Sequence, residues 1–164
     1  MLNSVDSIRA ERDVLLTLNA LCRPGGLVFF SGRRSEFNAD ALRAKVSARR
    51  KSHGRRVQFT DRHGFSGNFR HGEWFFQKFH NRRQALALGG RFIGPGIYDL
   101  SKSSWRIRAI NERRHPAGAT EAALSREFDL PLPGNRRFGR SQDILNAWRE
   151  SAAMEQWPEL IKAA

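Results

Sequence analysis

Apolar residues recur every three or four positions over residues 4–22, which predicts an amphipathic helix near the start of the chain. Ser4 or Ser7 can cap the beginning of this helix, and the Pro-Gly-Gly sequence of residues 24–26 ends it. The apolar run of residues 27–30 lies between turn-forming residues and predicts a short buried strand. The chain is therefore expected to begin with a helix followed by a strand.

A second helix is expected after this strand, beginning at Asn38 or Asp40. Leu42 and Val46 provide only a thin apolar stripe, so most of the helix surface should be polar. This helix is expected to lie on the surface of the protein.

Between residues 55 and 79 the pattern changes to a period of two, which is typical of half-buried strands. Val57 and Phe59 alternate with polar neighbours, several glycines interrupt the segment, and residues 74–79 are strongly aromatic. We expect an antiparallel meander of two or three strands here. A short helix over residues 82–88, stopped by two glycines, should follow.

The last third of the chain is predicted to be helical. One helix should run from Ser101 to about His115, a second should be capped by Thr120, and a third should be capped by Ser141. In the first of these helices the inward positions would be Trp105, Ala109 and Ile110.

Glycines and a proline at residues 94–96 form the clearest break in the chain. We expect an α/β, basic, nucleic-acid-binding region over residues 1–94 and a helical C-terminal region over residues 97–164, with one continuous domain as the alternative. The predicted fold class is α+β: a small antiparallel β-sheet packed against helices, with a helical C-terminal part.

Composition is consistent with a folded chain that has no covalent cross-links. The 164 residues are 40% hydrophobic and include 12 Phe and 4 Trp, enough to form a core. Cys22 is the only cysteine, which excludes an intrachain disulfide and a cysteine-rich zinc site. The sequence has no apolar run of 18 residues and no secretory signal pattern. We expect a soluble, intracellular (cytoplasmic) protein without a membrane partner.

Charge indicates the kind of partner. The chain has 29 Lys and Arg against 16 Asp and Glu, a formal net charge of +13. A surplus of this size favours binding to a polyanion. Nucleic acid is the first choice, because neutralising its phosphates releases condensed counterions and yields affinity without any base contact. Protein subunits of a nucleoprotein complex are expected as additional partners.

The positive charge is unevenly distributed along the sequence. Residues 33–56 contain nine basic and two acidic residues, whereas residues 141–164 contain two basic and four acidic residues. Arginine outnumbers lysine, and its guanidinium group can grip phosphate with two hydrogen bonds. We predict nucleic-acid contacts from Arg43, Lys45, Arg49, Arg50, Lys51, Arg55, Arg56, Arg70, Trp74, Lys78, Arg82, Arg83, Arg136 and Arg137.

Two further basic groups accompany these residues. In a strand, Trp74, Phe76 and Lys78 would share one face, on which an exposed ring could stack on bases; the alternative is that both faces are buried. The expected helix over residues 101–115 would carry Lys102, Arg106, Arg108, Arg113 and Arg114 on its polar side, either as a binding surface or as an ordinary solvated face.

Evidence for catalysis in the sequence is weak, and we expect a binding protein that needs no cofactor or metal rather than an enzyme. Asp61-Arg62-His63-Gly64 resembles the aspartate-arginine-glycine-histidine signature of non-specific nucleases, with the order of glycine and histidine reversed. One alternative is therefore a metal-dependent nuclease that uses His63 or His71. The other is a basic protein-interaction module or inhibitor that docks on an acidic protein surface.

A double charge reversal tests the predicted second helix. If its polar face lies along a phosphate backbone, Arg49→Glu combined with Arg50→Glu should abolish retention on duplex or single-stranded DNA in moderate salt and leave the fold intact. Gel mobility shift measures retention, and circular dichroism controls for folding. Unchanged retention would remove this helix from the binding surface.

Overall fold

The computed structural model describes residues 7–34, 44, 48, 57–59, 64–70, 73–101, 104–132 and 134–163, some of them as backbone only. Four helices and eight strands lie in this part of the chain, and the α+β class is confirmed. Of the expected second helix only residues 44 and 48 are described, and Leu42 and Val46 lie outside the described residues.

The N-terminal helix α1 spans Ile8–Leu21 and is capped by Ser7, whose Oγ accepts a hydrogen bond from the Ala10 amide at 3.1 Å. This confirms the predicted helix and one of its two expected caps. At the other end, the Asn111 amide donates to the carbonyls of Asn19 and Cys22 at 2.9 and 2.6 Å. Asn111 therefore satisfies carbonyl groups that a helix end leaves without partners.

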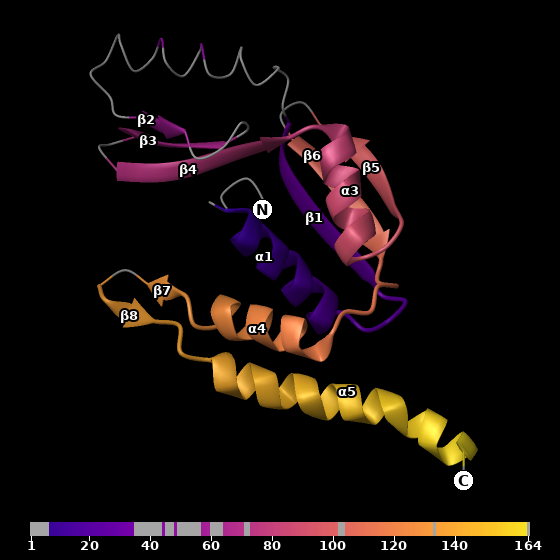
Figure 1. The fold of residues 1–164 in the computed structure, drawn as a ribbon. Helices are drawn as coiled ribbons and strands as arrows, with labels where there is room; N and C mark the ends of the chain where they lie inside the picture. The colour runs from indigo at the N-terminus through magenta and orange to yellow at the C-terminus, as the bar shows by residue number, and fades with distance from the viewer. Residues whose placement is uncertain are drawn as a thin grey trace.

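The main sheet has six strands in the order β2-β3-β4-β1-β6-β5. Their bounds are β1 Leu27–Arg34, β2 Val57–Phe59, β3 Gly64–Arg70, β4 Glu73–His80, β5 Gly96–Leu100 and β6 Ser104–Ile110. All neighbouring strands are antiparallel except β1 and β4, which pair in parallel over Arg33↔Phe79 and Arg34↔His80. Because this pairing is short, β2, β3 and β4 extend from the rest of the sheet as an arm (Figure 1). The predicted meander is confirmed.

The expected helix over residues 101–115 is wrong, because residues 104–110 form strand β6. Trp105, Ile107 and Ala109 are buried, and the residues between them are exposed. The helical prediction relied on Trp105, Ala109 and Ile110, but Ile110 faces solvent. The strict alternation of a strand, with β-branched Ile107 at its centre, prevails over the helical spacing.

The remaining helices are α3 Arg82–Phe92, α4 Ala117–Glu127 and α5 Ser141–Ala163, and a small hairpin pairs β7 Pro131–Leu132 with β8 Arg136–Arg137. Helix α3 continues through the two glycines expected to stop it, and Gly89 packs directly against the Phe30 ring. Thr120 does not cap α4; it is buried inside the helix, which begins after Pro116. Helix α5 packs on α4 and is the outermost helix in Figure 1.

Helices α1 and α3 cover one face of the sheet, and α4 packs on α1. Buried side chains of α1, α3 and α4 pack with Val28, Phe30, Trp105, Ile107 and Ala109 in one core. The face of the sheet that carries these five residues is called the inner face below. Arg126 of α4 donates two hydrogen bonds, of 2.6 and 2.7 Å, to Asp13 of α1 and ties these helices together.

Trp105 is the centre of the core. Its ring is fully buried, meets Phe30 and His80 edge-on, stacks on Tyr98, and donates from Nε1 to the Arg33 carbonyl at 3.1 Å. A Cβ atom at Gly32 would lie 2.5 Å from Trp105 Cζ2, closer than packed atoms can approach. The absence of a side chain at Gly32 in β1 therefore makes room for the Trp105 ring of β6.

Substitution of two glycines by alanine should have opposite effects on stability. Gly32→Ala must displace the Trp105 ring and is expected to cost about 1–3 kcal/mol of unfolding free energy. Gly90→Ala, in α3 with open space around the added methyl group, should stabilise by about 0.5–1 kcal/mol. Thermal unfolding measures both; a Gly32→Ala variant as stable as the wild type would contradict the assigned packing.

Candidate nucleic-acid interface

Half of the predicted binding residues lie outside the described part of the chain. These residues come from the expected second helix and the segment after it: Arg43, Lys45, Arg49, Arg50, Lys51, Arg55 and Arg56. Arg70 and Trp74 lie on the two strands of the β3–β4 hairpin, near its turn, and only their backbones are described. These nine assignments stay predictions.

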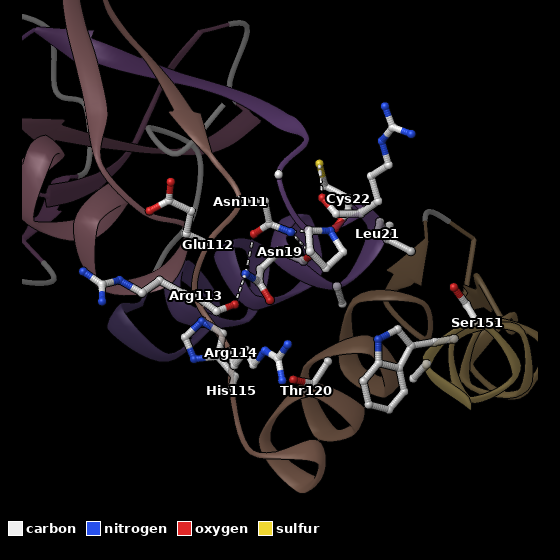
Figure 2. Close-up of a pocket in the computed structure, with 16 residues that line it drawn as sticks. Asn19, Leu21, Cys22, Asn111, Glu112, Arg113, Arg114, His115, Thr120 and Ser151 are labelled. Atoms are coloured by element: carbon white, nitrogen blue, oxygen red, sulfur yellow. Dashed lines mark hydrogen bonds between the residues drawn. The ribbon is translucent and has the colours of Figure 1, made fainter. Parts of the chain in front are cut away.

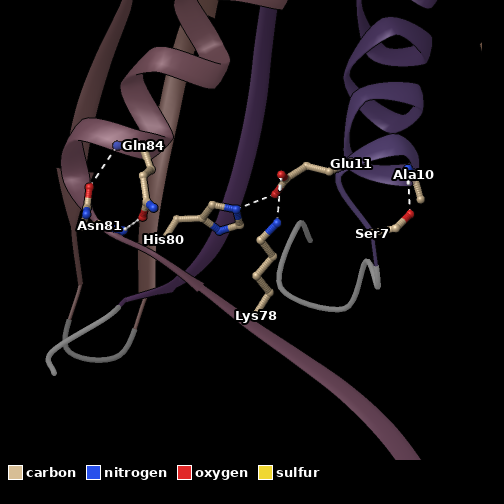
Figure 3. Close-up of polar contacts among 7 residues, drawn as sticks. All are labelled: Ser7, Ala10, Glu11, Lys78, His80, Asn81 and Gln84. Carbon is tan, nitrogen blue, oxygen red and sulfur yellow. Dashed lines mark hydrogen bonds and ion pairs between the residues drawn. The ribbon is translucent and has the colours of Figure 1, made fainter. Parts of the chain in front are cut away.

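Lys78 is not a surface cation, so its assignment to a nucleic-acid surface is wrong. It lies in the part of β4 that faces α1, and its ammonium is buried 3.2 Å from Glu11 Oε2 (Figure 3). His80, two residues further along β4, binds the other Glu11 oxygen through Nε2. Burial beside a carboxylate makes Lys78 a structural residue, because removing a paired charge from its partner inside a protein is costly.

The Glu11–Lys78–His80 cluster joins α1 to β4 by charge. Burial alone would raise the pKa of Glu11, but the hydrogen bond and charge of His80 and the ammonium of Lys78 together lower it below its ordinary value. All three residues are less than a tenth exposed. The carboxylate–histidine pair is therefore enclosed within the protein, where it holds two elements together.

The other predicted cations have different surroundings. Arg82 and Arg83 are exposed at the start of α3, and the guanidinium of Arg82 lies 5.6 Å from the centre of the Tyr98 ring. Arg137 lies in the β7–β8 hairpin and donates to both carboxylate oxygens of Asp129, at 3.0 and 2.6 Å. Arg136 is also exposed in this hairpin. Arg137 is thus engaged with an acid of the protein itself.

The sheet brings together an additional set of residues that the sequence analysis placed on a helix or did not select. Along β1 and β6, and in part of β5, every second side chain points away from the covering helices. These side chains define the outer face: Leu27, Phe29, Ser31, Arg33, Arg106, Arg108, Ile110, Ile97 and Asp99.

Strand register arranges the outer face in rows. Phe29 lies directly opposite Arg108, which lies opposite Ile97 on its other side. In the next row, Arg106 lies between Ser31 and Asp99. Directly opposed side chains have Cβ atoms about 4.5–5.5 Å apart. Aromatic, aliphatic and cationic groups are therefore neighbours on one face of the sheet.

The outer face carries net positive charge on arginines that are exposed to solvent. Arg33, Arg106 and Arg108 are exposed, against the single acid Asp99. In the described ranges, no ion pair involves any of these three arginines. By contrast, arginines of α4, α5 and the segment before α5 are bound to acids, as in Arg126–Asp13, Arg149–Glu121 and Arg140–Asp143. The outer face thus has cations that the fold itself does not use.

A pocket of about 680 Å³ lies between the end of α1, the segment after β6, and helices α4 and α5 (Figure 2). Its floor is a hydrogen-bond network in which Asn19 donates to Asn111 Oδ1 at 2.5 Å and to the Arg113 carbonyl at 2.9 Å. At its rim, Arg113 donates to the Gly90 carbonyl at 2.8 Å. These polar groups connect helices to the sheet, so the pocket has a structural explanation.

Comparison with models of protein families, with curated proteins and with solved structures finds no match to this chain. Among the described side chains, no three His, Cys, Asp or Glu residues lie close enough to hold a metal ion. No helix in the described part of the chain is both long and apolar enough to cross a membrane.

Stability in acid tests the buried cluster. Because the pKa of Glu11 is lowered on folding, its contribution to stability is complete above its ordinary value of 4.5 and is lost as the pH falls through the lower folded value. Glu11→Gln should cost about 3–5 kcal/mol near neutral pH, since Lys78 is left buried without its carboxylate, and should weaken this acid dependence.

The matched control is Glu11→Gln combined with Lys78→Met, which removes both partners and should recover part of the loss. Chemical denaturation at several pH values measures the free energies. Equal stability of the wild type and the single variant would contradict the assigned ion pair.

Proposed function

We propose that this protein binds nucleic acid, and that the outer face of the sheet contributes to binding through Arg33, Arg106 and Arg108. The observation that carries this proposal is that these cations are exposed on one face and form no ion pair with an acid among the described residues. The net charge of +13 supports the same class of partner.

Phosphate binding follows from the spacing of these cations. Arg106 and Arg108 are two residues apart on β6, so their Cα atoms are about 6.5 Å apart and their side chains point the same way. Each guanidinium can donate two parallel hydrogen bonds to a phosphate group. Because β6 is already packed against the core through its inner face, only the arginine side chains themselves need to become ordered when phosphate binds.

The predicted basic helix over residues 38–51 and the exposed Arg82 and Arg83 would extend this surface or form a second one. The nuclease alternative relies on His63 and His71, which lie outside the described residues. Incubation with plasmid DNA and Mg²⁺ tests this alternative, because a nuclease cuts the DNA and a protein that only binds leaves it whole.

Charge reversal on the outer face tests the proposal. Arg106→Glu combined with Arg108→Glu should weaken binding to mixed-sequence DNA and RNA oligonucleotides by about tenfold or more at ~0.1 M salt. It should also reduce the slope of log affinity against log salt by about 1.4 on a single strand, or about 0.7 for each lost phosphate contact. Fluorescence anisotropy over a salt series measures both quantities.

The control variant reverses the same amount of charge elsewhere. Arg9 and Arg12 are exposed on α1, which covers the inner face, so Arg9→Glu combined with Arg12→Glu should have the smaller effect. Equal losses in the two variants would mean that net charge alone controls binding and would refute the outer face as the site.

A further inference from the structure

We infer that the outer face selects single-stranded nucleic acid, with an unpaired base stacked on the ring of Phe29. This inference rests on the proposed function and names its substrate class. It depends on one residue that charge alone does not explain: Phe29 is 65% exposed in β1, whereas its direct neighbours Val28 and Phe30 are buried.

The surroundings of Phe29 suit the stacking of a nucleobase on its ring. Its row on the outer face continues through Arg108 to Ile97, which is 55% exposed, and Leu27 and Ile110 form the next exposed apolar pair. Contiguous exposed apolar groups of this kind mark binding surfaces. A base lying on the Phe29 ring would have its sugar-phosphate chain within reach of Arg108, and Arg106 lies one row further along β6.

The shape of this surface favours a single strand over a duplex. Bases in a duplex are stacked on one another and present only their edges in the grooves, so a duplex offers no ring face on which Phe29 could stack. An unpaired base presents its whole ring face, and aromatic side chains bind that face regardless of base identity. A duplex would therefore contact the arginines alone, and a single strand would contact the arginines and Phe29.

Charge argues against a second copy of the chain as the occupant. In a symmetric dimer through this face, Arg33, Arg106 and Arg108 of one copy would approach those of the other, and like charges brought together at an interface are unfavourable. A polyanion with exposed ring faces complements both the cations and the apolar groups.

Substitution of Phe29 separates stacking from charge. Phe29→Leu keeps an apolar side chain and removes the ring, whereas Phe29→Trp keeps a ring. Binding of labelled oligo-dT, oligo-U and a mixed-sequence DNA duplex is measured by anisotropy at one salt concentration. Wild-type protein should bind the single strands more tightly than the duplex. Phe29→Leu should lose about tenfold on the single strands and little on the duplex, and Phe29→Trp should retain single-strand binding.

Phe138 provides the matched control, because it is 47% exposed next to the β7–β8 hairpin, away from the sheet. Phe138→Leu should leave single-strand binding unchanged, and circular dichroism verifies that each variant is folded. If Phe29→Leu binds single strands as tightly as the wild type, or the wild type prefers duplex, stacking on Phe29 is refuted while charge-driven binding can stand. A wild-type protein that binds no oligonucleotide would refute the proposed function itself.

Analytical sedimentation of the protein without nucleic acid measures its oligomeric state and tests whether a second copy of the chain occupies the outer face. A wild type that dimerises and a Phe29→Leu variant that stays monomeric would assign the outer face to a second copy of the chain and overturn the inference. Monomeric behaviour of both proteins supports a face that is open to a nucleic-acid strand.

Discussion

Packing of Trp105 against β1 is the interaction on which the rest of this structure depends. The indole fills the space left by Gly32 and contacts one aromatic ring on each of the strands β1, β4 and β5. Its Nε1 donates a hydrogen bond to the Arg33 carbonyl. Because a shift of one residue in β6 would turn Trp105 outward, this packing specifies the register between β1 and β6. The same register places Phe29 opposite Arg108 on the other side of the sheet. The core thus determines the composition of the exposed face.

In the part of the chain that the structure describes, helices cover only one side of these strands, and the two sides differ in charge. On the covered side, charges that burial would otherwise penalise are paired: Glu11 binds the buried Lys78, and the buried Asp13 binds Arg126. On the uncovered side, three exposed arginines face a single acid. Internal ion pairs therefore stabilise the assembly of helices on the sheet, and the positive surplus of the outer face is available for a partner.

Much of the fold could be predicted from periodicity alone. Ser7 and the apolar stripe after it located α1, the apolar run after Gly26 located β1, and alternation located the β2–β4 meander. The sequence of β6 misled because Trp105 and Ala109 are spaced by four, which fits a helix, and only the full alternation through Ile107 indicates a strand. Gly89 was expected to end the helix over residues 82–88, but α3 continues through it. A glycine is accommodated there because the Phe30 ring occupies the space that a side chain would need.

The candidate site was harder to predict than the fold. Basic runs in the sequence identify residues that are close along the chain, whereas the outer face is assembled from alternate residues of β1 and of the consecutive strands β5 and β6, which are far from β1 in the sequence. Lys78 was misassigned because a lysine in an aromatic strand has no sequence signal for burial; its partner Glu11 is 67 residues away. Pairing across strands, which requires the tertiary structure, brought Arg106, Arg108 and Phe29 together.

A titration of isotope-labelled protein with a short single-stranded oligonucleotide, followed by amide NMR, tests the central claim most directly. The account predicts that among the described residues the largest shifts occur at β1, β6 and β5, around Phe29, Arg106 and Arg108, while amides in α1 and α4 change little. Shifts concentrated on α1 and α4, or no shifts on the three strands while the oligonucleotide is bound, would contradict it.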